Sequence, residues 1–204
     1  MNQADTLKEK TLNQMPKSAS SNLNLPNSIT FLRIFLIPVF SWMFSDPTPD
    51  RAFWSVIIFF GAALTDFLDG YLARKSGQIT NLGKLLDPVA DKLLVASGLI
   101  LLVQFQRVAV WLAIVLIARE LIVTGARAVA AREGLVVPAD TTGKVKVVAQ
   151  ISGILCLIAV GIFEPIDSFL LEAGNLMLYA ALVFSLWSCW GYLTCITKKI
   201  GQQW

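Results

Sequence analysis

The chain contains no histidine, and only 15% of its 204 residues are charged. The lack of histidine excludes a histidine base, nucleophile or metal ligand, so acid–base chemistry must fall to carboxylates, lysine or tyrosine. There are only three cysteines, Cys156, Cys189 and Cys195, without metal-ligand spacing and in apolar stretches, which predicts packing residues rather than a disulfide. The formal net charge of +3 is spread along the borders of apolar segments, which argues against a nucleic-acid partner.

What the chain does contain is apolar sequence: 55% of the residues are hydrophobic and the mean hydropathy is +0.64. The apolar runs are of the length that crosses a bilayer as a helix. The sequence therefore predicts an all-α, polytopic integral membrane protein with six transmembrane helices, at about residues 28–44, 53–74, 83–103, 108–131, 144–163 and 171–196. We expect this membrane domain to occupy residues 25–204. Residues 1–24 are polar and have no apolar core for a cleavable signal, so we expect a tail or a surface helix there.

Basic residues are distributed unevenly between the two sets of connecting segments. Six spans put both termini on one side, and the loops on that side hold Arg74, Lys75, Lys84, Arg132, Lys144 and Lys146. The opposite turns hold only Arg51 and Arg107, together with five acids. Because cytoplasmic loops are enriched in Lys and Arg, we expect the termini and the acidic residues described next to face the cytoplasm.

Four carboxylates gather where the second and third spans meet. Asp66 and Asp69 are three residues apart, Asp87 and Asp91 are four apart, and each spacing places a pair on one face of a helix. A short loop makes the two helices antiparallel, so the acidic faces can meet. Ionisable groups within spans are functional by default, and hard divalent cations take oxygen ligands. The pattern predicts a metal site formed by Asp66, Asp69, Asp87 and Asp91. The alternative is that these acids only pair with Arg74, Lys75, Lys84 and Lys92.

The whole pattern from Asp66 to Asp91 reads D-x2-D-G-x2-A-R-x8-G-x3-D-x3-D. In this pattern the chain resembles the CDP-alcohol phosphotransferase family, and so does the Asn-x2-Thr-x2-Arg that opens the first span. The resemblance implies that family's fold, a homodimer, and transfer of a phospho-alcohol group from a CDP-alcohol to an acceptor hydroxyl with release of CMP. We expect two divalent ions, Mg²⁺ or Mn²⁺, at the aspartates. The resemblance makes Asp91 the base for the attacking hydroxyl, although spacing alone does not separate it from Asp87.

The donor, a CDP-lipid, is expected beside the acidic motif. Gly70 and Ala73 lie on the same helix face as the first acid pair and leave room for a ligand to approach the backbone. Arg74 is well placed to pair with a phosphate oxygen. The expected donor-binding residues are Asn27, Thr30, Gly70, Ala73, Arg74 and Gly83.

A second set of cations lies apart from this motif. Arg119 is a charge within an apolar helix, and adjacent helical residues point apart, so we expect its partner to be another acid or an anionic substrate rather than Glu120. Arg33 also lies within an apolar run, where it contacts phosphate or the acidic cluster, or snorkels to the headgroups. A basic pocket beside a metal site favours an acceptor that carries phosphate. The expected acceptor-binding residues are Arg33, Arg119, Arg127, Lys144 and Lys146.

The segments 118–127 and 143–150 resemble the branch of the family that uses sn-glycerol 3-phosphate as acceptor. The resemblance implies transfer of a phosphatidyl group from CDP-diacylglycerol to that acceptor, in contact with membrane lipid at the cytoplasmic face of a bacterial inner membrane. A cardiolipin synthase or a phosphatidylinositol-phosphate synthase of the same family remains an alternative. A divalent-cation carrier is an alternative from another class, since intramembrane acids also mark ion paths. The crowding of all four acids at one end of the spans argues against it.

Overall fold

The computed structural model describes the backbone of residues 25–76, 81–132 and 141–201, and the side chains of 30–65, 89–130 and 145–189. Within these ranges the chain forms six α-helices and one 3-10 helix, with no strand. They are α2 (Leu25–Phe44), α3 (Pro49–Ser76), α4 (Asn81–Gln104), α5 (Val110–Arg132), α6 (Thr141–Ala159), η1 (Glu164–Ile166) and α7 (Asp167–Gly201). The prediction of an all-α chain is confirmed.

Membrane-spanning length is a stricter criterion than helix content. Among the described residues, Glu164–Cys189 is the one helical stretch long and apolar enough to cross a membrane, while Thr30–Phe44 and Val145–Ala159 are shorter apolar helices. The six-span topology therefore stays a prediction.

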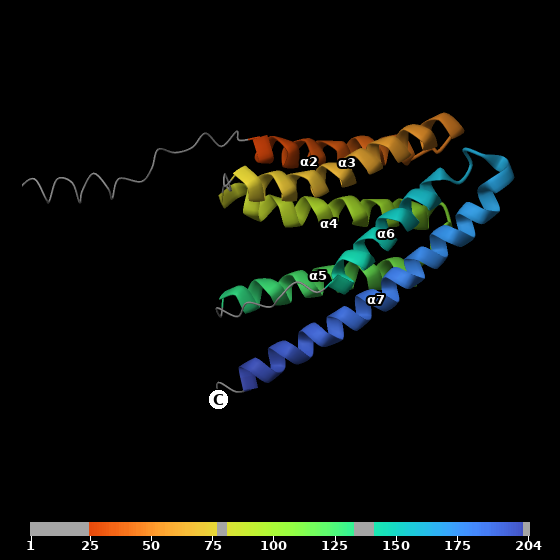
Figure 1. The fold of residues 1–204 in the computed structure, drawn as a ribbon. Helices are drawn as coiled ribbons and strands as arrows, with labels where there is room; N and C mark the ends of the chain where they lie inside the picture. The colour runs from red at the N-terminus through yellow and green to blue at the C-terminus, as the bar shows by residue number, and fades with distance from the viewer. Residues whose placement is uncertain (1–24, 77–80, 133–140, 202–204) are drawn as a thin grey trace, which may run out of the picture.

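The helices form an antiparallel bundle (Figure 1). Helix α2 packs against α3 and α4, α5 contacts α4 and α7, and α6 crosses the bundle to pack along α7. The turns after α2, α4 and α6 lie together at one end of the bundle, which we call the turn end (residues 45–48, 105–109 and 160–166). The first residues of α2 and the last residues of α7 lie at the opposite end, as expected for an even number of helices.

Among the described side chains, a hydrophobic core lies towards the turn end. Phe40 stacks on Phe44 with ring centroids 5.9 Å apart, and it also contacts Phe59 at 5.3 Å. Phe44 meets the edge of Phe105 at 5.4 Å. The fully buried leucines and isoleucines of α4 to α7 complete this core, namely Leu99, Leu102, Leu112, Leu116, Ile154, Leu157, Ile158 and Leu178. This packing holds the helices together at the turn end.

The turn between α4 and α5 closes without a glycine. Gln106 has a φ of 57°, and the amides of Gln106 and Arg107 donate to the carbonyls of Val103 and Leu102 at 3.0 and 2.9 Å. This is a Schellman C-cap, in which the left-handed residue is usually glycine. Arg107 then donates to the carbonyls of Leu157 and Ile158, which ties the turn to α6. The turn predicted at residues 104–107 is confirmed.

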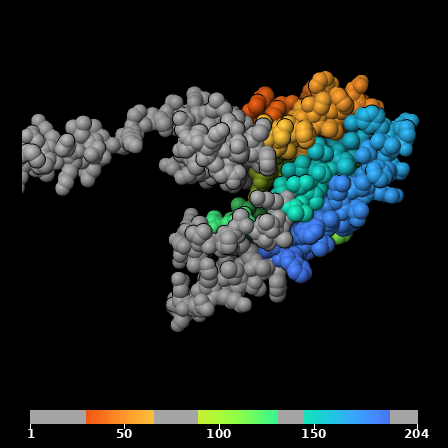
Figure 2. Space-filling view, viewed as in Figure 1, coloured from red at the N-terminus to blue at the C-terminus, as the bar shows by residue number. Residues whose placement is uncertain are grey.

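All six α-helices expose large apolar side chains, among them Trp42 at 69%, Phe169 at 69% and Trp187 at 76%. Figure 2 shows α3, α6 and α7 side by side on one such face. Exposed apolar surface on this scale marks a surface that meets another apolar phase, as expected if the helices face lipid. Cys156 and Cys189 are free, as predicted, and Cys195 lies outside the described side chains.

Candidate active site

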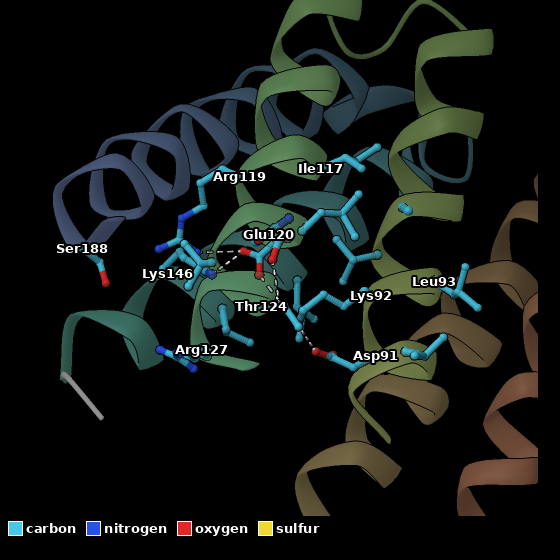
Figure 3. A pocket seen from close by; sticks show the side chains of 18 residues that line it. Asp91, Lys92, Leu93, Ile117, Arg119, Glu120, Thr124, Arg127, Lys146 and Ser188 are labelled. Carbon is cyan, nitrogen blue, oxygen red and sulfur yellow. Dashed lines mark hydrogen bonds and ion pairs between the residues drawn. The ribbon is translucent and has the colours of Figure 1, made fainter. Parts of the chain in front are cut away.

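A cavity of about 570 Å³ lies between α4, α5 and α6, away from the turn end. Its size is in the range of small-molecule sites. Most of the lining is apolar, but it includes four cationic and two anionic side chains, which Figure 3 shows around one space: Lys92, Arg119, Arg127, Lys146, Asp91 and Glu120.

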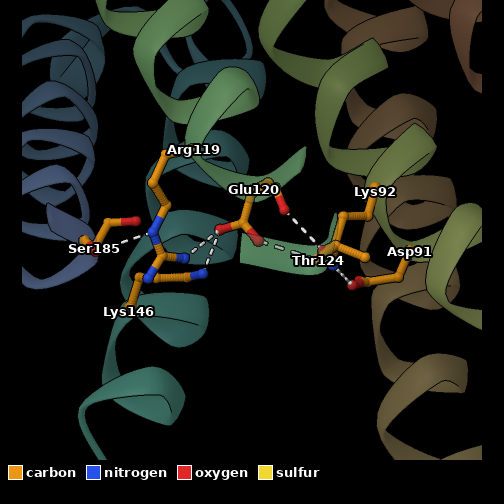
Figure 4. Close-up of polar contacts among 7 residues, drawn as sticks. All are labelled: Asp91, Lys92, Arg119, Glu120, Thr124, Lys146 and Ser185. Atoms are coloured by element: carbon orange, nitrogen blue, oxygen red, sulfur yellow. Dashed lines mark hydrogen bonds and ion pairs between the residues drawn. The ribbon is translucent and has the colours of Figure 1, made fainter. Parts of the chain in front are cut away.

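Glu120 connects three cations of this cavity. Lys146 on α6 donates to Glu120 Oε1, and Arg119 on α5 binds the same oxygen at 3.1 Å. Lys92 on α4 lies 3.8 Å from Glu120 Oε2. Figure 4 shows Glu120 between these partners. A buried charge is tolerated when it is paired, so one carboxylate from α5 allows three helices to bring cations to one place.

Arg119 does not have the partner that the sequence predicted. Its Nε donates to the carbonyl of Ser185 on α7 at 2.9 Å, and its guanidinium pairs with the adjacent Glu120. The expectation that Arg119 and Glu120 point apart was wrong. Although their Cβ atoms diverge on the helix, both side chains are long and flexible enough for their charged ends to meet beside the cavity. Arg119 is only 6% exposed, so the arginine side of this pair is buried.

Asp91 lies at the edge of the same cavity. Its Oδ2 accepts from Lys92 at 3.1 Å, so Lys92 lies between Asp91 and Glu120. For this acid the pairing with lysine anticipated as an alternative is observed. A carboxylate has about four lone-pair positions on two oxygens, so one lysine does not saturate it. Asp91 therefore keeps the chemical capacity for a ligand or base role.

The other acids of the motif are placed by their backbone alone. Asp66 and Asp69 lie in the second half of α3, and Asp87 lies on α4 with Asp91. Because α4 begins at Asn81, Asp87 is inside the helix rather than at its cap, and the four-residue spacing puts it on the face of Asp91. No cluster of three metal-ligating side chains occurs among the described residues. The side chains outside that range are those of Asn27, Asp66, Asp69, Gly70, Ala73, Arg74, Gly83, Asp87 and Lys144, so the four-aspartate site stays a prediction.

Thr30 and Arg33 share a buried face of α2, at 2% and 1% exposure. The buried side chain of Arg33 is inconsistent with snorkelling to the surface. Neither residue lines the cavity, whereas Arg119, Arg127 and Lys146 do. The structure thus brings three of the five predicted acceptor residues together and leaves Arg33 apart from them.

Sequence reasoning missed two residues of this cavity. Glu120 had been considered only as a partner of Arg119, and Gln150, which lines the cavity on α6, had been given no role. The available signals were an acid within an apolar helix, and a glutamine four residues after Lys146 and therefore on its helical face.

The chain matches the CDP-alcohol phosphatidyltransferase family over residues 23–187. It therefore belongs to this family, and the resemblance seen in the acidic motif is confirmed. The chain is 42% identical over 183 residues to the CDP-diacylglycerol–glycerol-3-phosphate 3-phosphatidyltransferase of Bacillus subtilis, covering 84% of this chain and 94% of that protein.

Two further relatives carry the same name. The protein of Haemophilus influenzae is 37% identical over 175 residues, covering 83% of this chain and 91% of its own length. The protein of Escherichia coli K12 is 36% identical over 185 residues, covering 88% of this chain and 98% of its own length.

Proposed function

We propose that this protein transfers a phosphatidyl group from CDP-diacylglycerol to sn-glycerol 3-phosphate, giving phosphatidylglycerophosphate and CMP. The observation that carries the proposal is the convergence of Lys92, Arg119 and Lys146 on one cavity beside Asp91. Charge-assisted hydrogen bonds from lysine and arginine are the strong interactions for a phosphate group. An acceptor that carries its own phosphate can pair with the cations of such a cavity, whereas an uncharged alcohol cannot. The names of the relatives described above agree with this acceptor.

The acceptor phosphate binds against Arg119 and Lys146, with the exposed Arg127 adding positive charge. We assign the same role to Lys144. Glu120 holds Arg119 and Lys146 in position before the acceptor arrives. Cations already gathered by the protein lose less freedom when the ligand binds, and such preorganisation strengthens binding. Thr30, on α2, serves the donor side with Asn27, Gly70, Ala73, Arg74 and Gly83.

Asp66, Asp69, Asp87 and Asp91 would hold divalent cations, Mg²⁺ or Mn²⁺, because their oxygens are the ligands that hard cations take. The described member of this set, Asp91, fits that role because its carboxylate borders the cavity. Bound ions would neutralise the charge that develops on the transferred phosphorus and on the leaving CMP.

Asp91 takes the proton of the acceptor hydroxyl. The oxygen of that hydroxyl forms the new bond to phosphorus, and the bond between this phosphorus and CMP breaks. Arg74 binds an oxygen of the donor phosphate during this step.

The proposed location is a bacterial inner membrane, with two copies forming a dimer. The end of the bundle opposite the turn end, which we call the cavity end, faces the cytoplasm. The exposed apolar side chains and the 26-residue apolar stretch Glu164–Cys189 support insertion. The excess of basic residues in the loops at the cavity end supports the orientation.

The test is incorporation of labelled sn-glycerol 3-phosphate into lipid by the purified protein in detergent, with phosphatidylglycerol and inositol phosphate as rival acceptors. We expect label in lipid that requires both CDP-diacylglycerol and Mg²⁺ and that is lost in Asp91→Asn. Preference for phosphatidylglycerol or inositol phosphate would contradict the proposed acceptor. Metal uptake into vesicles without any lipid product would contradict the enzyme.

A further inference from the structure

Gln150 carries a buried, unsatisfied donor in the wall of the cavity. Its side chain is 3% exposed and lines the cavity, and its Nε2 has no hydrogen-bond partner among the described residues. A buried polar group left unpaired destabilises a protein by about 1–3 kcal/mol, and such a group in a native structure calls for an explanation. A ligand in the cavity provides one.

The position of Gln150 indicates which part of the ligand it contacts. Lys146 and Gln150 are four residues apart on α6 and share one face, with Cβ atoms about 5–6 Å apart. Lys146 belongs to the cations proposed to bind the acceptor phosphate, so Gln150 lies one helical turn beyond that phosphate. The attacking hydroxyl must lie near Asp91, which is on α4 and not on α6. The acceptor has three polar groups: the phosphate, the attacking hydroxyl and a second hydroxyl that does not react. The first two have partners elsewhere, so the second hydroxyl is the group that Gln150 can bind.

We infer that Gln150 hydrogen-bonds the non-reacting C2 hydroxyl of the acceptor and thereby makes the site specific for a phosphorylated diol over a simple phosphorylated alcohol. This inference rests on the proposed function. A site built to pair with a substrate hydroxyl rejects an analogue that lacks it, because the buried group of the protein is then left unpaired. The amide of glutamine can both donate and accept, which suits a hydroxyl.

The experiment compares two acceptors, sn-glycerol 3-phosphate and 3-hydroxypropyl phosphate, which lacks the C2 hydroxyl. We expect the wild-type protein to prefer the first by about 5- to 150-fold in kcat/KM, the ratio that corresponds to one unpaired buried group. Gln150→Met keeps the length of the side chain but removes its amide. It should lower kcat/KM for sn-glycerol 3-phosphate by the same factor and leave 3-hydroxypropyl phosphate within about twofold. The KM for CDP-diacylglycerol should not change.

The matched control is Gln104→Met, a glutamine exposed at the end of α4, which should alter neither acceptor. An equal loss with both acceptors in Gln150→Met would assign Gln150 to packing and overturn the inference. Equal use of both acceptors by the wild-type protein would overturn it even if Gln150→Met failed to fold. Failure of the wild-type protein to use either acceptor would instead contradict the proposed function.

Discussion

Arg107 is half-buried and Arg119 is buried, but they lie in different halves of the bundle and have different partners. At the turn end, Arg107 donates to the carbonyls of Leu157 and Ile158 at 2.7 and 3.3 Å and lies over the ring of Phe44 at 5.6 Å. Burial lowers the pKa of Arg107 and the charge of Asp167 opposes this shift, yet an arginine stays protonated in proteins. In the cavity, Arg119 shares the carboxylate of Glu120 with lysines from two other helices.

We interpret Arg107 as a structural residue and Arg119 as a ligand-binding residue. The donors of Arg107 are directed at carbonyls of α6, so they stabilise a turn against a helix. Around Glu120 a single carboxylate serves Arg119, Lys146 and Lys92, and the described lining of the cavity carries more cations than anions. Positive charge held around an open cavity suits an anionic ligand.

The largest expected effect lies at Asp91. Asp91→Asn should lower kcat by about 10²–10⁴-fold, because general-base catalysis contributes that much. The matched control is Asp46→Asn at the turn end, where the carboxylate is exposed and pairs with Arg51 at 3.1 Å. An exposed ion pair contributes only about 0–1 kcal/mol, so this variant should stay active. Turnover by Asp91→Asn at the rate of the control would contradict the role of the cavity end in the chemistry.

The contact between α6 and α7 should be the most sensitive position for stability. A Cβ at Gly174 would lie 2.6 Å from Leu157 Cγ and 3.0 Å from the carbonyl oxygen of Gly153. Gly174→Ala should therefore lower the free energy of unfolding by about 1–3 kcal/mol, the usual effect of overpacking. A Cβ at Gly61 meets nothing within 4 Å, so Gly61→Ala should be neutral or stabilising. Thermal unfolding in detergent measures both, and equal Tm values for the two variants would argue against close packing here.

Arg107→Met tests whether the cation at the turn end is structural. It removes the donors to two carbonyls of α6, and we expect a loss of about 1–3 kcal/mol in stability. The KM values for both substrates should stay unchanged, because Arg107 lies away from the cavity. A raised KM with unchanged Tm would remove the distinction between the two arginines.

The smallest expected effect is at Gln106, whose φ of 57° suits glycine. Gln106→Gly should stabilise the protein by about 0.5–1 kcal/mol, because the relief of left-handed strain exceeds the added freedom of the unfolded chain. Gln106→Ala keeps a Cβ and should give no such gain. An equal rise in Tm for both variants would mean that the backbone conformation is not the cause.

The helices could be predicted from the sequence because turn-forming residues and apolar runs are local signals. Pro47 and Pro49 mark the first turn, and the polar residues Gln104, Gln106 and Arg107 mark the third. The conformation of Gln106 could not be predicted, since a left-handed C-cap without glycine is selected by the packing of the turn.

The site was predictable only in part, because it also depends on how distant segments pack together. The cations Arg119 and Lys146 stood out as charges near apolar sequence. Their common partner Glu120 depends on how three helices converge, and the adjacent-residue rule gave the wrong answer for Arg119. Gln150 became visible only once its burial and its unpaired amide nitrogen were known.

The central claim is that the cavity binds the phosphate of the acceptor, and the most direct measurement is the KM for sn-glycerol 3-phosphate in Lys146→Met beside Arg107→Met. A hydrogen bond to a charged group contributes about 1.5–3 kcal/mol, so Lys146→Met should raise this KM about ten- to hundredfold. The KM for CDP-diacylglycerol should be unaffected, and Arg107→Met should show neither change. Equal increases in both KM values of Lys146→Met, or no increase at all, would contradict the account.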